Sequence, residues 1–275
     1  MMKGIIFVPS IEETNWVREI LPNISPAELP IAGKQYIDYA LELAEKRGYE
    51  MAEVLDWNYS ERLAKTFTDL TRFSIPIFYQ KGVGEMPKSN EDLARQSSPL
   101  TQNLDQGTTV VWGLRLAEFI IRDVNDWHKI NMDILDNRAL NTHFTLPGYS
   151  AEGGVYLGRN VIMEHGVEVK KPVILQDDAW CARNVRLDGL CIIGKGSFIG
   201  EGARLERTVV GDDTYIGSGL ELEDKIVIGP RIIDAKTGVW ADVDDPGMAS
   251  KIGNNIGFFG KILDFLRGKA RRRKQ

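Results

Sequence analysis

Residues 157–204 read LGRNVI, MEHGVE, VKKPVI, LQDDAW, CARNVR, LDGLCI, IGKGSF and IGEGAR, and rungs of the same kind continue to Ile232. The first place of each six-residue rung is apolar and the fifth is small or aliphatic, with one single-residue slip at Val209–Val210. This spacing fits neither an amphipathic helix nor a hairpin meander. It predicts a parallel β-helix, in which each short strand buries its apolar side chains only by stacking on the next coil.

The rungs resemble the hexapeptide repeat of left-handed β-helices, in which three rungs make one triangular coil. The resemblance implies an all-β, left-handed parallel β-helix over residues 157–233. Beyond it the pattern lapses into the Gly-, Pro- and Asp-rich stretch AKTGVWADVDDPG, and we expect residues 234–250 to cap the last coil. A cap is needed because the final strands otherwise present unpaired edges.

The composition is that of a globular protein without a membrane span. The 275 residues are 27% charged and carry a net charge of −5. No apolar run approaches the roughly 18 residues of a transmembrane helix, and the start, MMKGIIFVPS, lacks a signal-peptide cleavage site. Cys181 and Cys191 occupy inward places of the repeat, which predicts reduced core thiols in a cytoplasmic protein. No Cys/His grouping has metal-ligand spacing, so no metal site is expected.

Residues 1–125 alternate between strand and helix patterns. Strands are predicted at Lys3–Val8, Met51–Leu55 and Ile75–Tyr79, helices at Gln35–Arg47 and Thr109–Ile121, and a long loop at Gly82–Gln106. Strands alternating with helices predict an α/β domain with a parallel, Rossmann-like sheet. Residues 126–156 are expected to connect this domain to the β-helix.

Three segments resemble those of sugar-1-phosphate nucleotidyltransferases. LPIAGKQYIDY (29–39) is similar to their LPVAGKPLIDY, and GTTVVWGLRLAEFI (107–120) is similar to their GTAxALxxA segment. DWHKINMDILDNRAL (126–140) resembles the connector that joins such domains to a C-terminal left-handed β-helix. The resemblance implies a shortened nucleotidyltransferase-like domain that binds a sugar phosphate or sugar nucleotide. The pocket residues it implies are Gly33, Lys34, Gly107 and Thr108, although turns and helix starts use the same residue types.

The departures from that family concern its chemistry. FVPSIEETNW (7–16) stands where the family has a glycine-rich phosphate loop, and Pro26 stands where it has a phosphate-pairing lysine. No strand precedes Asp123 or Asp126 to present a Mg²⁺ ligand, on which nucleotidyl transfer depends. We therefore expect a binding or scaffolding protein of sugar-nucleotide or surface-polysaccharide metabolism that needs no cofactor. Residual nucleotidyl transfer with Mg²⁺ is one alternative.

The other alternative is acyl transfer by the β-helix. Many left-handed β-helices are acyltransferases in which a histidine acts as general base on a sugar hydroxyl or amine that attacks an acyl thioester such as acyl-CoA. His165 is the only histidine of the repeat and takes the outward third place of MEHGVE, where Glu164 or Glu168 could orient it. The fourth place holds Gly166 rather than the aspartate of the family's EHD or AHD rungs. Outward polar places are more often simply solvated, and that interpretation stays open.

The tail, residues 251–275, is basic and amphipathic. Eight cations against Asp264 give it a net charge of +7, so the rest of the chain carries −12. Its apolar and basic groups are Phe258, Phe259, Ile262, Leu263, Phe265 and Leu266, followed by Arg271, Arg272 and Arg273. The tail could bind an anionic membrane at its inner face, or it could pack on the β-helix or on a second copy. The acidic body argues against nucleic acid, and the flat faces of a β-helix predict a homodimer or homotrimer.

Overall fold

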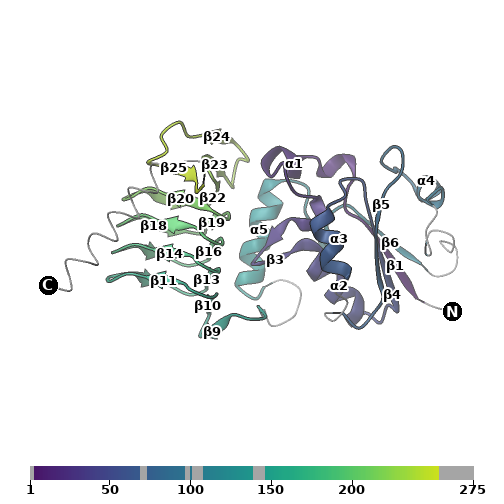
Figure 1. Cartoon of the computed structure of the whole chain (residues 1–275), viewed down its shortest axis with the longest axis horizontal. Coiled ribbons are helices and arrows are strands. Elements are labelled where there is room, and N and C mark those ends of the chain that lie inside the picture. The colour runs from purple at the N-terminus through teal and green to yellow at the C-terminus, as the bar shows by residue number, and fades with distance from the viewer. Residues whose placement is uncertain (1–2, 69–72, 97–99, 101–107, 139–145, 254–275) are drawn as a thin grey trace. The chain divides into compact units, whose positions relative to one another are not determined.

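The computed structural model describes residues 3–68, 73–96, 100, 108–138 and 146–253 of the chain (Figure 1). The chain divides into two compact units, and the boundary falls inside helix α5 (Val124–Leu135), between Asn131 and Met132. The N-terminal unit is an α/β domain. The C-terminal unit is a stack of short parallel strands.

A four-stranded parallel sheet in the order β5-β4-β1-β6 forms the N-terminal unit, which confirms the α/β prediction. The strands are β1 (Gly4–Val8), β4 (Met51–Asp56), β5 (Ile77–Lys81) and β6 (Thr109–Trp112). The helices are α1 (Trp16–Ile20), α2 (Tyr36–Lys46), α3 (Glu61–Thr68) and α4 (Asn90–Ala94). Two short hairpins complete it, β2 (Pro30–Ile31) with β3 (Lys34–Gln35) and β7 (Arg115–Leu116) with β8 (Phe119–Ile120).

Strand β1 is central because its sequence, GIIFV, is apolar on both faces. Ile6 and Val8 pack in a buried cluster with Leu55 and Leu93, whereas Phe7 faces the opposite side of the sheet. From β1 the chain proceeds outward through β4 and β5 and then returns to the other side of β1 as β6. Such a reversal of strand order creates the crevice in which doubly wound α/β proteins usually bind ligands, at the carboxyl ends of β1 and β6.

The predicted helix at Thr109–Ile121 is wrong. This segment forms strand β6 and the β7–β8 hairpin. Val110 and Trp112 alternate toward the cluster around Ile6 and Val8, which is the two-residue period of a strand. Gly113 then adopts a φ of +65°, which ends the strand. The predicted loop Gly82–Gln106 likewise contains α4, whose first turn is capped by the side chain of Ser89.

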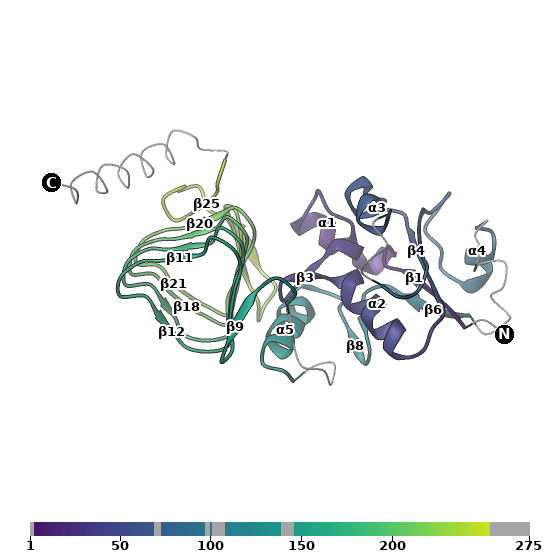
Figure 2. The same ribbon diagram turned by 60° about the horizontal axis from the view of Figure 1, so that its bottom comes forward.

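The C-terminal unit is a parallel β-helix with three sheets, as the repeat predicts; its hand remains a prediction. Figure 2 shows its coils stacked on one another. The first sheet contains β10 (Val155–Leu157), β13 (Val173–Leu175), β16 (Cys191–Ile193), β19 (Val209–Val210) and β22 (Lys225–Ile228). The second contains β11 (Ile162–Met163), β14 (Trp180–Cys181), β17 (Phe198–Ile199) and β20 (Thr214–Ile216). The third contains β12 (Glu168–Val169), β15 (Arg186–Leu187), β18 (Arg204–Glu206) and β21 (Glu221–Glu223).

The register of the coils departs from the prediction in one respect. Val173 pairs with Cys191, a full coil of 18 residues, but Ile192 pairs with Val209 and Val209 with Ile226, each only 17 residues on. A second single-residue slip therefore follows the predicted one. Positive φ angles at Arg207 (43°) and Asp224 (53°) mark the two shortened turns.

The inward side chains shift with that register. Val210 and Val227 face the core, whereas Val209 and Ile226, which the repeat places inward, stand on the outer side. A shift of one residue reverses the face that every side chain of a strand presents.

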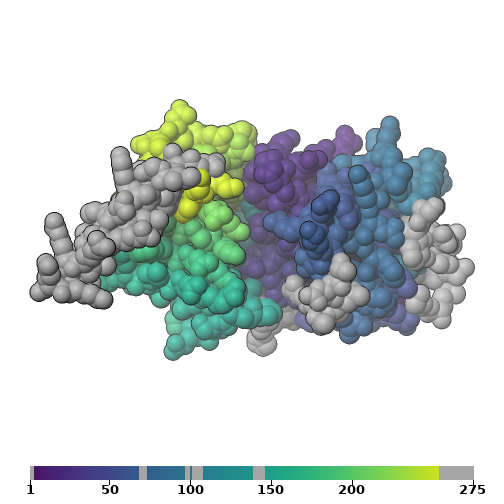
Figure 3. Space-filling model, viewed as in Figure 1, coloured from purple at the N-terminus to yellow at the C-terminus, as the bar shows by residue number. Residues whose placement is uncertain are grey.

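Antiparallel strands cover the last coil. Strand β23 (Arg231–Asp234) pairs with β22, and β24 (Trp240–Asp242) pairs with β23. Strand β25 (Ala249–Lys251) adds to β20, and the yellow segment that contains these strands lies over one end of the stack (Figure 3). A β9 strand (Ser150–Glu152) pairs with β10 at the other end.

Both thiols are expected to resist alkylation in the native protein. Cys181 and Cys191 are fully buried in the core of the β-helix and are not joined in a disulfide. Desolvation by burial raises the pKa of each thiol to about 12, so the thiolate that reacts is scarce at neutral pH. Mass spectrometry after iodoacetamide treatment should find both unmodified in buffer and both modified in denaturant. Rapid labelling in buffer would contradict the buried placement.

Candidate functional site

The crevice between β1 and β6 is filled by the loop that follows β1. The Thr14 hydroxyl donates to the carbonyl of Pro9 at 3.0 Å and accepts from the backbone N–H of Ile11 at 3.1 Å. A Cβ placed on Gly113 would lie 2.9 Å from the Ile11 side chain and 3.8 Å from that of Thr14. The loop therefore packs directly on the end of β6, at the place where the family resemblance implies a phosphate site.

Behind this loop, Asp56 ends β4 with a fully buried carboxylate. It accepts hydrogen bonds from the hydroxyls of Ser10 and Ser25, from the Tyr79 hydroxyl at 2.9 Å and from the backbone N–H of Asn58 at 2.8 Å. Desolvation and then the charge of Asp56 raise the pKa of Tyr79 far above its ordinary value, so the phenol stays protonated and donates. Donors that could bind an anionic ligand here are already bound to this carboxylate.

A second buried carboxylate, Glu28, lies beside the first. It accepts from the backbone N–H of Ser25, the hydroxyl of Ser60 and the guanidinium of Arg62, each at 3.0 Å. Two buried anions at the carboxyl edge repel a nucleoside triphosphate. Sequence reasoning missed both residues, and the only signal was an aspartate directly after the buried strand MAEVL.

Gly33 and Lys34 lie in and just after the β2–β3 turn. Gly33 has a φ of +82°, which a glycine adopts without steric cost. The Lys34 ammonium lies 2.9 and 3.0 Å from the two carboxylate oxygens of Glu42 and 5.0 Å from the ring centroid of Tyr39. Its charge is therefore already neutralised within the fold.

Thr108 is not brought near Lys34. Thr108 directly precedes β6 and so lies at the amino edge of the parallel sheet. Lys34 lies just before the start of α2. Because α2 ends near the start of β4, at the amino edge of the sheet, α2 begins at the carboxyl edge, and so Lys34 lies at that edge. Gly107 lies outside the described residues. The four predicted pocket residues are therefore not assembled into one site by the residues that the structure describes.

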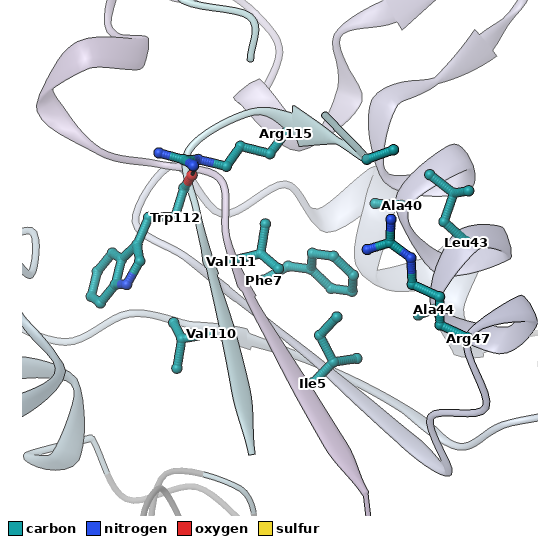
Figure 4. A pocket seen from close by; sticks show the side chains of 11 residues that line it. Ile5, Phe7, Ala40, Leu43, Ala44, Arg47, Val110, Val111, Trp112 and Arg115 are labelled. Carbon is teal, nitrogen blue, oxygen red and sulfur yellow. Dashed lines mark hydrogen bonds between the residues drawn. The ribbon is translucent and has the colours of Figure 1, made fainter. Parts of the chain in front are cut away.

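A cavity of about 230 Å³ lies instead between α2 and strands β1 and β6 (Figure 4). Its apolar lining includes Ile5, Phe7, Ala40, Leu43, Ala44 and Val111. Arg47 and Arg115 border it, and Arg115 Nε donates to the carbonyl of Trp112 at 3.2 Å. Neither guanidinium pairs with a carboxylate among the described residues, so both charges are open to an anion.

On the β-helix, His165 occupies the corner turn between β11 and β12 of the first coil and is exposed. Its carbonyl accepts from the backbone N–H of Asn184 at 3.3 Å. Within the described part of the chain its imidazole has no hydrogen bond or ion pair. Glu164 lies 3.9 Å from Arg183, and Glu168 lies 3.3 Å from Arg186, so neither predicted carboxylate orients the ring.

The charged side chains around this corner are largely engaged with each other. Arg183 pairs with Glu201 of the next coil at 2.8 Å. At the next corner of the coils, directly after β12 and β15, Lys170 and Arg204 both bind Asp188 and hold the pKa of its carboxyl below the usual range. His165 therefore differs from its charged neighbours, because its imidazole makes no hydrogen bond or ion pair with the described residues.

Two further kinds of site bear on the described residues, a metal-ion cluster and a membrane-spanning helix. No three His, Cys, Asp or Glu side chains there are grouped to hold a metal ion. None of the described helices is long and apolar enough to cross a membrane. The predicted tail residues, Phe258, Phe259, Ile262, Leu266 and Arg271 to Arg273, lie outside the described part.

The chain matches no protein-family model and no curated protein sequence. Among solved structures it is similar to the acetyltransferase domain of PglB from Neisseria gonorrhoeae FA1090 in complex with acetyl coenzyme A, at 14% identity. That alignment covers 83% of this chain and 97% of the other, with a TM-score of 0.20. PerB from Caulobacter crescentus, in complex with CoA and GDP-perosamine, is 16% identical over 83% of this chain and 95% of the other, also with a TM-score of 0.20. These similarities are too low to assign a family.

Proposed function

We propose that the chain is a transferase that acylates a hydroxyl or amino group of a sugar nucleotide, with His165 as the general base. The observation that carries this proposal is the exposed imidazole at a corner turn whose charged neighbours are paired with each other. A general base needs an accessible nitrogen that is not committed to an internal contact. The expected pocket around Lys34 is not formed among the described residues, so acyl transfer takes precedence over a purely binding role.

The chemical step uses the imidazole of His165 and two substrates. A ring nitrogen of His165 removes the proton from the sugar hydroxyl or amine, whose oxygen or nitrogen attacks the thioester carbonyl. The C–O or C–N bond forms, the C–S bond breaks, and the imidazolium returns its proton to the departing thiolate. The acyl thioester is a substrate here rather than a resident cofactor.

A second copy of the chain is expected to complete the site. His165 lies on an exposed turn, and the cavity described above is lined only by residues of the N-terminal unit. An acyl donor and a sugar must be held in register to react, which requires a second wall beside the turn. A homo-oligomer that joins β-helices would supply it.

Nucleotidyl transfer is not part of the proposal. That reaction requires cations around the triphosphate to neutralise developing charge. The carboxyl edge of the sheet instead holds the buried carboxylates of Asp56 and Glu28. We therefore expect no pyrophosphate from nucleoside triphosphates, Mg²⁺ and sugar-1-phosphates.

The test is an assay of the full chain with acetyl-CoA and a panel of amino- and hydroxy-sugar nucleotides. Release of free thiol in step with a sugar product about 42 Da heavier, the gain when an acetyl group replaces the hydrogen that His165 removes, would support the proposal. In a parallel assay with nucleoside triphosphate, Mg²⁺ and sugar-1-phosphates, pyrophosphate release by a chain that releases no thiol from acetyl-CoA would favour nucleotidyl transfer over acyl transfer. A folded oligomer that turns over no member of the panel would overturn acyl transfer with these donors.

The cavity supports a second candidate function, in which the N-terminal unit binds the sugar nucleotide without reacting. Hydrogen bonds to charged groups contribute about 1.5–3 kcal/mol, so a diphosphate between Arg47 and Arg115 would be held by both. We expect nucleoside diphosphate sugars to raise the melting temperature, and Arg47→Ala with Arg115→Ala to weaken that binding at least about ten-fold. Arg122→Ala, at an exposed arginine paired with Asp126, is the matched control. Equal binding by all variants would place the ligand elsewhere.

A further inference from the structure

The first coil of the β-helix lies at an end of the stack that is only partly covered. Figure 1 shows β9, β10 and β11 at this end and β24 and β25 at the other. Strand β9 covers the edge of β10, but among the described residues β11 pairs only with β14, and β12 only with β15. In the described part of the chain, two of the three sheets therefore end here in strands without an outer partner. We call this surface the open end.

Apolar side chains are exposed at the open end. Met163 takes the inward place that Cys181 takes one coil further on, yet Met163 is 42% exposed whereas Cys181 is fully buried. Ile162 beside it is 44% exposed. Val169 is half-buried, whereas its equivalent in the next coil, Leu187, is fully buried. The first coil therefore leaves in contact with water the apolar surface that a neighbouring coil would bury, and a cover over it is favourable.

The backbone of the first coil also has hydrogen-bonding groups that face the open end. The N–H groups of Ile162 and Glu164 donate to carbonyls of the second coil, each at 2.9 Å. Successive residues of a strand direct their N–H and C=O groups to alternate sides, so those of Met163, which lies between these two, point away from the second coil. The same alternation applies to Val169 in β12. Such an edge can form hydrogen bonds with a strand placed against it.

The charges on the first coil fit a partner that carries the same surface. Residues 150–172 hold three carboxylates and three cations, Glu152, Glu164, Glu168, Arg159, Lys170 and Lys171. This end is therefore neutral, although residues 1–250 as a whole carry −12. In a symmetric contact between two copies a surface meets itself, and a surface of one sign would repel its counterpart. A balanced surface avoids that repulsion.

We propose that the open end binds the open end of a second copy of this chain. The first coils of the two copies then cover the exposed Met163 and Val169 of each other. Two coils that meet in this way run in opposite directions, so their edges meet as antiparallel strands, the arrangement that β9 and β10 already adopt. The end of one coil is a small surface, at the low end of interface sizes, below about 1,200 Å² in total, so the dimer forms only as concentration rises. The contact involves no substrate and does not depend on acyl transfer.

Sedimentation velocity of the full chain without substrates tests the proposal. We expect the share of dimer to rise with protein concentration. Met163→Glu places a carboxylate from each copy in an apolar contact and should weaken dimerisation at least about ten-fold. Met248→Glu is the matched control, because Met248 is 41% exposed just before β25 at the other end of the β-helix, and it should leave the dimer unchanged.

Hydrogen exchange separates loss of the contact from misfolding. The backbone amides of Met163 and Val169 should exchange at least about ten-fold more slowly in concentrated than in dilute samples. The amide of Trp180, which donates to the carbonyl of Ser197 in the third coil, should stay protected in every variant.

Three results would overturn the proposal. The first is a chain that is monomeric at every concentration. The second is an oligomer that Met163→Glu leaves intact while Trp180 stays protected, because the copies would then join through another surface. The third is slow exchange at Met163 in the dilute monomer, which would assign the cover to another part of the same chain.

Discussion

Replacing His165 by alanine is expected to lower kcat/KM for acyl transfer about 10²–10⁴-fold, the contribution typical of a general base. Without the imidazole, the sugar hydroxyl or amine must lose its proton to water during attack on the thioester. The rate is measured as thiol release at fixed acyl donor over a range of sugar concentrations. The loss should appear in kcat, because the base acts in the transition state and contributes little to ground-state binding.

Ser218 provides the matched control for that variant. It takes the same place as His165 in the corresponding corner turn of the fourth coil and is likewise exposed. Ser218→Ala should keep full activity. Because neither side chain is buried, both variants should unfold within about 0.5 kcal/mol of the parent. An active His165→Ala protein would remove this residue from the reaction.

The β-helix could be predicted from sequence because its contacts repeat at a fixed short spacing. Each inward residue meets its equivalent one coil away, so a period of six shows directly in the chain. The second register slip was not predicted from the sequence. Asp224 adopts a positive φ there, but so do other turn residues of the β-helix that cause no slip, so an aspartate does not mark the position. Ile226, Val227 and Ile228 are all apolar, so the period alone could not choose which of them face the core.

The N-terminal unit was harder to predict because its decisive contacts join distant segments. The Thr109–Ile121 segment became a strand because β1 offered an apolar edge for Val110 and Trp112, which local pattern does not reveal. Lys34 was expected to bind a ligand, but the fold brought Glu42 against it. The contacts of Asp56 reach 46 residues back to Ser10 and 23 residues forward to Tyr79, and no spacing in the sequence marks them.

Replacing Asp56 by alanine is expected to destabilise the N-terminal unit by about 3–5 kcal/mol. The change leaves the buried hydroxyls of Ser10 and Ser25 and the backbone N–H of Asn58 without their acceptor. Each unsatisfied buried donor costs about 1–3 kcal/mol. Urea unfolding combined with hydrogen exchange in β1 and β4 measures the loss in this unit separately from the β-helix.

Two further aspartate variants identify the cause. Asp126→Ala removes a carboxylate whose partner, Arg122, is exposed, and should cost less than about 1 kcal/mol. Asp56→Asn keeps one acceptor oxygen, but its amide N–H groups face the hydroxyl and backbone donors that bind Asp56. Its stability should therefore fall between those of the parent and Asp56→Ala. If Asp56→Ala were instead as stable as the parent and bound nucleoside triphosphates, the carboxyl edge would be a masked ligand site. The carboxylate would then act as an internal substitute for phosphate rather than as the structural anchor of the loop after β1.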